Sequence, residues 1–180
     1  MRWPFNRFKK QPPAPSRRTI EAIYGTIVAQ AREPAFYQAY GVPDSVNGRF
    51  DMVLLHLWMV LRQLRSGPDD AVAQALFDHF CSDMDANLRE MGVGDLSVPK
   101  RMQAFGEAFY GRSAAYDRAL VEGLEPLARA LDKNIYSGGN IDSARRLAAY
   151  TADAIAALAR GDCATLTTEG LRFPDLAQRE

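Results

Sequence analysis

Residues 78–112 read DHFCSDMDANLREMGVGDLSVPKRMQAFGEAFYGR, and this stretch predicts two helices joined by a tight corner. We expect the first helix to end at Gly92, because glycine readily adopts the left-handed conformation that terminates helices. Val98 and Pro99 open the second helix, since proline is favoured in a first helical turn. Gly92 and Gly94 are therefore predicted to shape the corner of a helical hairpin.

Charged side chains and one tyrosine are concentrated on this hairpin. They are Asp83, Asp85, Arg89, Glu90, Asp95, Lys100, Arg101, Tyr110 and Arg112. Mixed charge with an aromatic ring on a rigid corner suits recognition of a polypeptide, so these residues are the predicted partner contacts. Intramolecular ties are the alternative, because Asp85 and Arg89 have the spacing of a helical ion pair. Arg112 would then bridge to a carboxylate of the preceding helix, and both interpretations stay open for each residue.

Apolar residues recur every three or four positions along most of the chain, which predicts amphipathic helices. The predicted helices cover residues 17–31, 46–65, 68–92, 98–120, 121–131 and 140–160. The helix of residues 121–131 is expected to be broken near Gly123 and Pro126. An aromatic turn is expected at 35–40, and His56 is interpreted as a core histidine rather than a ligand. No strand pairing is visible, so the prediction is an all-α fold with a single compact domain of about six helices. This domain spans residues 19–161, between an N-terminal arm of residues 1–18 and a C-terminal tail of residues 162–180.

The arm carries six basic residues and no acidic residue, although the whole chain has a formal net charge of zero. Its prolines prevent a continuous helix, so we expect it to be disordered or extended. Aromatic rings alternate with cations in it, and the candidate anchor residues are Trp3, Phe5, Phe8, Lys9 and Lys10. They suit the surface of an anionic membrane. Ribosomal RNA would attract the same cations, and the third interpretation is a terminus without function; no DNA partner is expected.

Enzyme chemistry has little support in the sequence. There is no GxSxG, no phosphate-binding glycine loop and no zinc-ligand spacing, so we expect no catalytic residue, no metal and no cofactor. The two cysteines form no CxxC motif and indicate a reducing compartment. We expect no signal peptide, and the longest apolar run is too short to cross a bilayer. The alternative is a metal-dependent helical enzyme or small-molecule binder that uses the acids of Asp78–Asp85, but no second acidic helix motif accompanies them.

The hairpin sequence resembles the ubiquinol–cytochrome c chaperone family. The likeness is carried by MDANLREMGVGDLSVPKRM at residues 84–102 and EAFYGR at residues 107–112. Ile23-Tyr24-Gly25, the helix over residues 50–65 and Asn134-Ile135-Tyr136 also look like the family. The resemblance covers roughly residues 19–160.

This resemblance implies an assembly chaperone that is not an enzyme. It would bind newly made cytochrome b and promote assembly of the ubiquinol–cytochrome c reductase complex, respiratory complex III. The chain looks like a bacterial member, which implies a peripheral position on the cytoplasmic face of the inner membrane or a soluble cytoplasmic one. Inner-membrane lipid and the ribosome are further candidate partners through the arm, and the need for a small partner protein is left open.

Overall fold

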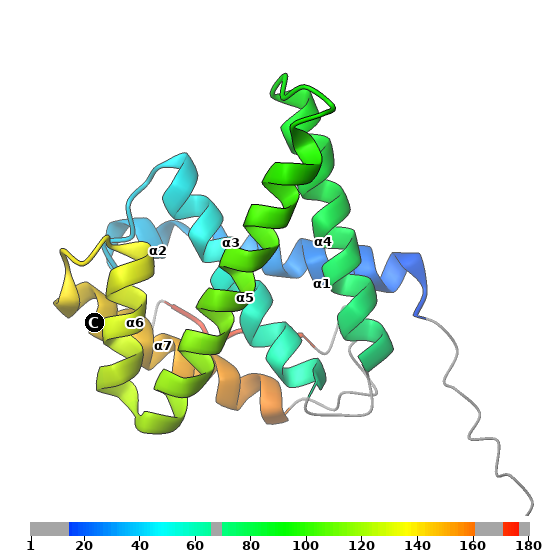
Figure 1. Cartoon of the computed structure of the whole chain (residues 1–180). Helices are drawn as coiled ribbons and strands as arrows, with labels where there is room; N and C mark the ends of the chain where they lie inside the picture. Colours follow the sequence, from blue (N-terminus) through cyan, green and yellow to red (C-terminus); the bar gives the residue numbers. More distant parts are fainter. Residues whose placement is uncertain (1–14, 66–69, 161–170, 177–180) are drawn as a thin grey trace, which may run out of the picture.

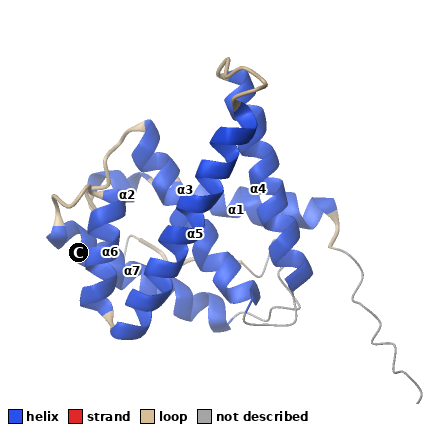
Figure 2. Cartoon of the chain, viewed as in Figure 1, coloured by secondary structure: helices blue, strands red, loops and turns tan. Residues whose placement is uncertain are grey.

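The computed structural model describes residues 15–65, 70–160 and 171–176, and within them it confirms the all-α prediction. These residues form helices and no strand (Figures 1 and 2). The helices are α1 (Arg17–Ala31), α2 (Pro34–Gln38), α3 (Val46–Arg65), α4 (Asp70–Glu90), α5 (Val98–Glu122), α6 (Leu124–Ile135) and α7 (Ile141–Arg160). The short α2 replaces the predicted aromatic turn, because Pro34 supplies a favoured first helical residue.

Helix α3, which carries apolar side chains on nearly every side, forms the centre of the molecule. It contacts α1, α4, α6 and α7, and its buried side chains include Leu55, Leu57 and Met59. The Ser45 side chain begins the helix by accepting a hydrogen bond from the Gly48 amide, 3.1 Å away. A Cβ atom on Gly48 would lie 2.0 Å from the Pro43 carbonyl oxygen, so only glycine fits at this position.

The boundary between α5 and α6 differs from the predicted one. Helix α5 continues to Glu122, and Gly123, with φ +125°, separates it from α6. Pro126 does not interrupt α6, because it lies in the first turn, where its missing N–H would have no helical partner. The predicted break near Gly123 is confirmed, and the one near Pro126 is wrong. The predicted bounds of residues 121–131 are also wrong at both ends, and α6 extends to Ile135, which is buried against the core.

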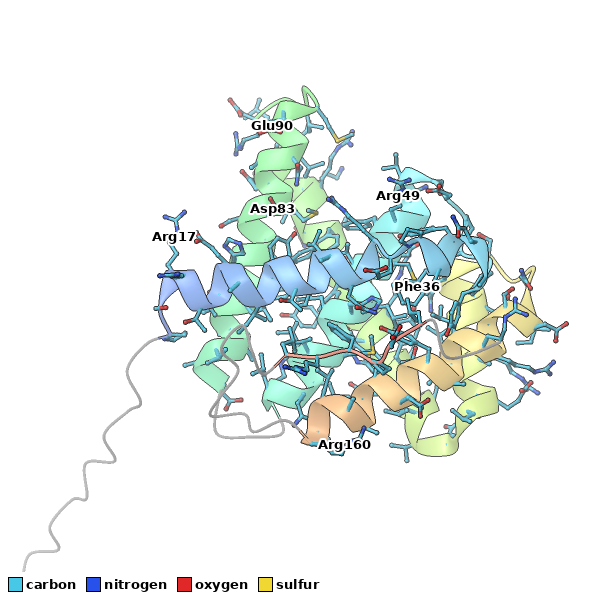
Figure 3. All side chains as sticks on the ribbon, turned by 180° about the vertical axis from the view of Figure 1, so that it is seen from behind. Arg17, Phe36, Arg49, Asp83, Glu90 and Arg160 are labelled. Atoms are coloured by element: carbon cyan, nitrogen blue, oxygen red, sulfur yellow. The ribbon has the colours of Figure 1, made fainter. Side chains whose placement is uncertain are left out.

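His56 is a fully buried core histidine, as the sequence indicated. Its Nδ1 lies 2.7 Å from the Met52 carbonyl oxygen, and its Nε2 lies 2.8 Å from the Tyr150 hydroxyl oxygen. Burial lowers the pKa of His56 to about 4, because the charged imidazolium is poorly solvated there. The segment of residues 171–176, seen from behind in Figure 3, closes over this side: Leu171 is buried and the Phe173 ring meets His56 edge-on.

Two sequence-based interpretations fall largely or wholly outside the described residues. Trp3, Phe5, Phe8, Lys9 and Lys10 of the predicted arm all lie there. Most of the predicted C-terminal tail also lies outside them.

Among the described helices, none has a stretch that is both long and apolar enough to pass through a bilayer.

Candidate functional site

The hairpin formed by α4 and α5 projects beyond the rest of the helices (Figure 1). Gly92 has φ +80° and ends α4, and the Val93 amide donates to the Leu88 carbonyl oxygen at 3.0 Å. This left-handed glycine is the helix stop that the sequence predicted. Gly94 does not have a positive φ, and a Cβ there would meet no atom within 4 Å. The structure therefore gives no steric reason for glycine at position 94.

Three of the predicted contact residues bind one another near the tip. The Arg89 Nε donates to Asp85 at 2.6 Å, and a terminal nitrogen of Arg89 donates to Asp95. The predicted pair of Asp85 and Arg89 is therefore present, and Asp95 extends it into the connecting loop. All three side chains are solvent-accessible, so the network orders the tip more than it stabilises the fold.

Two other predicted contacts tie the hairpin to the rest of the molecule. Asp83 accepts a hydrogen bond of 2.7 Å from the hydroxyl of Tyr24 on α1. Arg112 pairs with Asp51 of α3, so the expected bridge from Arg112 to the helix that precedes the corner is wrong. The reason is that α5 also passes α3, and Asp51 faces Arg112 across that contact. Figure 3 shows Asp83 low on the hairpin, beside α1, and Glu90 near its tip.

The remaining predicted contacts are available to a partner. Glu90, Lys100 and Arg101 are exposed and form no hydrogen bond or ion pair through their side chains with any residue that the structure describes. Tyr110 is 50% exposed, and one side of its ring contacts Phe77 and Phe109. The outer part of the hairpin therefore presents two cations and a carboxylate, and Tyr110 adds a half-exposed ring nearer the base, two residues from Arg112.

Sequence reasoning missed two apolar side chains at the tip. Met91 is 76% exposed and Leu96 is 98% exposed, and both lie in the loop that connects α4 to α5. Their place in the sequence could have revealed this, because both lie in the predicted corner between the two helices, which projects away from the rest of the domain. The tip therefore offers apolar surface in addition to charge.

The acids of Asp78–Asp85 are separated rather than gathered into a cluster. Asp78 accepts a hydrogen bond from Gln74, and Asp83 accepts one from Tyr24. Within residues 15–65, 70–160 and 171–176, no group of three or more His, Cys, Asp or Glu side chains is placed to hold a metal ion. Asp78, His79 and Asp83 instead line an open hollow of about 640 Å³ between the start of α1 and α4.

Segments that are far apart in the sequence meet at a second hollow, of about 610 Å³. Phe50 of α3, Arg112 of α5 and Asn134 of α6 all line it, and each belongs to a stretch singled out in the sequence. The Phe50 and Phe105 rings approach to 5.6 Å between centroids and form part of its apolar wall. The pair of Asp51 and Arg112 also lies here, so this hollow adjoins the base of the hairpin.

Comparison with known proteins identifies this architecture. The model of the family described as "Ubiquinol-cytochrome C chaperone" matches residues 38–173. The chain belongs to the ubiquinol-cytochrome C chaperone family. The resemblance predicted from the hairpin sequence is therefore confirmed. The match includes the whole hairpin and ends at residue 173.

Relatives within this family include proteins named ubiquinol-cytochrome c reductase complex assembly factor 1. The Xenopus laevis protein is 23% identical over 115 residues, which are 63% of this chain and 58% of that protein. The Mus musculus protein is 27% identical over 117 residues, which are 64% of this chain and 40% of that protein. The chain thus spans about two fifths to three fifths of these relatives' length.

A solved structure has the same fold over nearly the whole chain. It is the crystal structure of the Cbp3 homolog from Brucella abortus, with a TM-score of 0.81 and 35% sequence identity. The similarity covers 90% of this chain and 92% of that one. The fold of that Brucella abortus chain is therefore present here almost in full.

Proposed function

We propose that this protein is an assembly chaperone that binds newly made cytochrome b and promotes assembly of the ubiquinol–cytochrome c reductase complex. Family membership and the names of the related assembly factors support a role in building this complex. In this account the protein acts by holding a partner chain and not by catalysis. The client is a cytoplasmic segment of cytochrome b, held until haem or other subunits arrive.

The observation that carries the proposal is the projecting hairpin, with its anchored base and exposed tip. Asp83 and Arg112 fix the two helices to α1 and α3, whereas Lys100 and Arg101 are exposed. Leu96 and Met91 add apolar surface in the loop that precedes these two cations. Apolar anchors surrounded by charge are the usual composition of a surface that binds another polypeptide.

The proposed place of action is the cytoplasmic face of a bacterial inner membrane, where the protein is peripheral or remains soluble. In this proposal the client enters that membrane, so a chaperone that meets it early would work at this surface. The basic, aromatic composition of residues 1–18 suits contact with anionic lipid there, or with the RNA of a translating ribosome.

A deletion strain tests the proposal. Loss of the chain should lower the amount of assembled ubiquinol–cytochrome c reductase and of spectroscopically detectable cytochrome b, and the wild-type chain should restore both. The variant M91S/L96S should restore them poorly, because it removes the apolar tip. V121S/L124S is the matched control, since it removes two exposed apolar residues at the α5–α6 junction. Unchanged levels of the complex in the deletion strain would refute the proposed function.

A further inference from the structure

We propose that a third hollow, of about 210 Å³ between α3 and α5, binds a carboxylate group carried on a short apolar stem. Trp58, Arg62 and Arg65 of α3 line it from one side, and Phe109, Ser113 and Asp117 of α5 line it from the other. This hollow is separate from the hairpin tip. The inference therefore goes beyond the proposed client contact.

Two polar atoms at this hollow lack the partner that burial normally demands. The indole Nε1 of Trp58 and the hydroxyl oxygen of Ser113 are both buried, and neither has a hydrogen-bond partner among the residues that the structure describes. Trp58 is only 3% exposed. Buried polar atoms in native proteins are nearly always satisfied, so two unpaired ones beside the same hollow point to a missing ligand. An indole N–H can only donate, which means that the ligand atom must be an acceptor.

The charges around the hollow favour an anionic acceptor. Arg62 is paired with Asp117, and Arg65 adds a second guanidinium that is exposed to solvent. The lining therefore has an excess of one positive charge. A carboxylate accepts hydrogen bonds from N–H and O–H donors and pairs well with guanidinium groups.

The size and walls of the hollow specify what carries the carboxylate. The rings of Trp58 and Phe109, with the side chain of Leu61, make one part of the lining apolar. An apolar cavity of about 150 Å³ can hold benzene, so a hollow of about 210 Å³ has room for a ring or short chain bearing one carboxylate. Such a group is found on small carboxylic acids and on the acidic side chains of proteins.

The Trp58 indole itself reports on binding. The chain has two tryptophans, so Trp3→Phe leaves Trp58 as the single source of an indole N–H signal. We would titrate the ¹⁵N-labelled full chain of this variant with sodium benzoate. A second titration uses a capped peptide with one glutamate, and a third uses benzyl alcohol as the uncharged match. A saturable downfield shift of the indole proton is expected with a carboxylate and not with the alcohol.

A shift with benzoate alone indicates a small carboxylic acid as the ligand, whereas a shift with the glutamate peptide indicates an acidic side chain of a protein. Ser113→Ala should weaken binding at least about tenfold, because a hydrogen bond to a charged group is lost. It should not lower the unfolding midpoint, since it removes an unpaired buried hydroxyl. Ser82→Ala, an exposed serine on α4, is the control and should change neither. If the indole proton shifts with neither carboxylate, or shifts equally with benzyl alcohol, the proposal is overturned. Water would then be the partner of the two buried polar atoms.

Discussion

Arg112 of α5 forms an ion pair with Asp51 of α3, and the Asp51 side chain is only 14% exposed. This pair fixes the long helix of the hairpin to the central helix of the domain. At the outer end of the same helix, Lys100 and Arg101 are exposed and have no partner among the described residues. The hairpin therefore combines an anchored base with a tip that is open to another molecule.

Removal of Arg112 should destabilise the fold. In Arg112→Ala the partly buried Asp51 carboxylate loses its counter-ion, and we expect the free energy of unfolding to fall by about 2 kcal/mol at pH 7. Urea denaturation measures this loss. Arg118→Ala is the control on the same helix, because Arg118 is exposed and its side chain has no partner among the described residues; it should change stability by less than about 0.5 kcal/mol.

The loss caused by Arg112→Ala should also depend on pH. Burial raises the pKa of Asp51, and the Arg112 guanidinium opposes that rise. Without Arg112 the folded-state pKa rises further, so Asp51 becomes protonated in the folded state at a higher pH than in the unfolded chain. The destabilisation should therefore be largest at neutral pH and shrink as the pH falls toward 4. A loss that is equal at every pH would contradict the assignment to Asp51.

Tyr24 should stabilise the contact between α1 and α4. Its hydroxyl donates to Asp83 at 2.7 Å, and burial together with this hydrogen bond raises the pKa of Tyr24. Tyr24→Phe removes one hydrogen bond to a carboxylate and should lower the free energy of unfolding by about 1–2 kcal/mol. Tyr110→Phe is the control, because that ring is half exposed and its hydroxyl has no hydrogen bond to the described residues. Equal effects of the two changes would show that the Tyr24 hydroxyl does not tie the helices.

Acid should weaken the fold through His56. The pKa of His56 is lowered to about 4 by burial, against about 6.5 in an unfolded chain, so the unfolded state binds more protons between these values. The stability that depends on neutral His56 is complete above pH 6.5 and declines as the pH falls toward 4, by up to about 3 kcal/mol. NMR of the ring protons tests this directly, since the chain has only two histidines. The urea-unfolded chain serves as the reference for an ordinary histidine. If His56 is half protonated near pH 6.5 in the folded protein, the lowered pKa is wrong.

Charge reversal at the tip should reduce client capture without unfolding the protein. In K100E/R101E, two exposed cations become acids, so we expect several-fold less cytochrome b in a pull-down and a nearly unchanged unfolding midpoint. R32E/R118E is charge-matched and changes exposed residues outside the hairpin tip. Equal recovery of cytochrome b by both variants would remove Lys100 and Arg101 from the client contact.

The local features of this fold were readable in the sequence, and the long-range ones were not. Apolar periodicity located the helices, Gly92 marked the end of α4, and the spacing of Asp85 and Arg89 predicted their ion pair. Each of these depends on neighbours within one or two helical turns.

The contacts that fix the hairpin join residues about 60 positions apart. Arg112 and Asp51 are 61 residues apart in sequence, and Tyr24 and Asp83 are separated by 59. No periodic pattern selects one such partner among many carboxylates, which is why Arg112 was expected to meet the neighbouring helix instead. Leu96 shows a related limit, since an apolar residue indicates burial only where another element is available to cover it.

The most direct test of the account replaces Leu96 with a photoreactive residue and crosslinks the full chain in its native membranes. Leu96 is 98% exposed at the hairpin tip, whereas Val121, exposed at the opposite end of α5, serves as the control position. We expect cytochrome b to be captured from position 96 and not from position 121. Capture from position 121 alone, or from neither position, would contradict the claim that the hairpin tip holds the client.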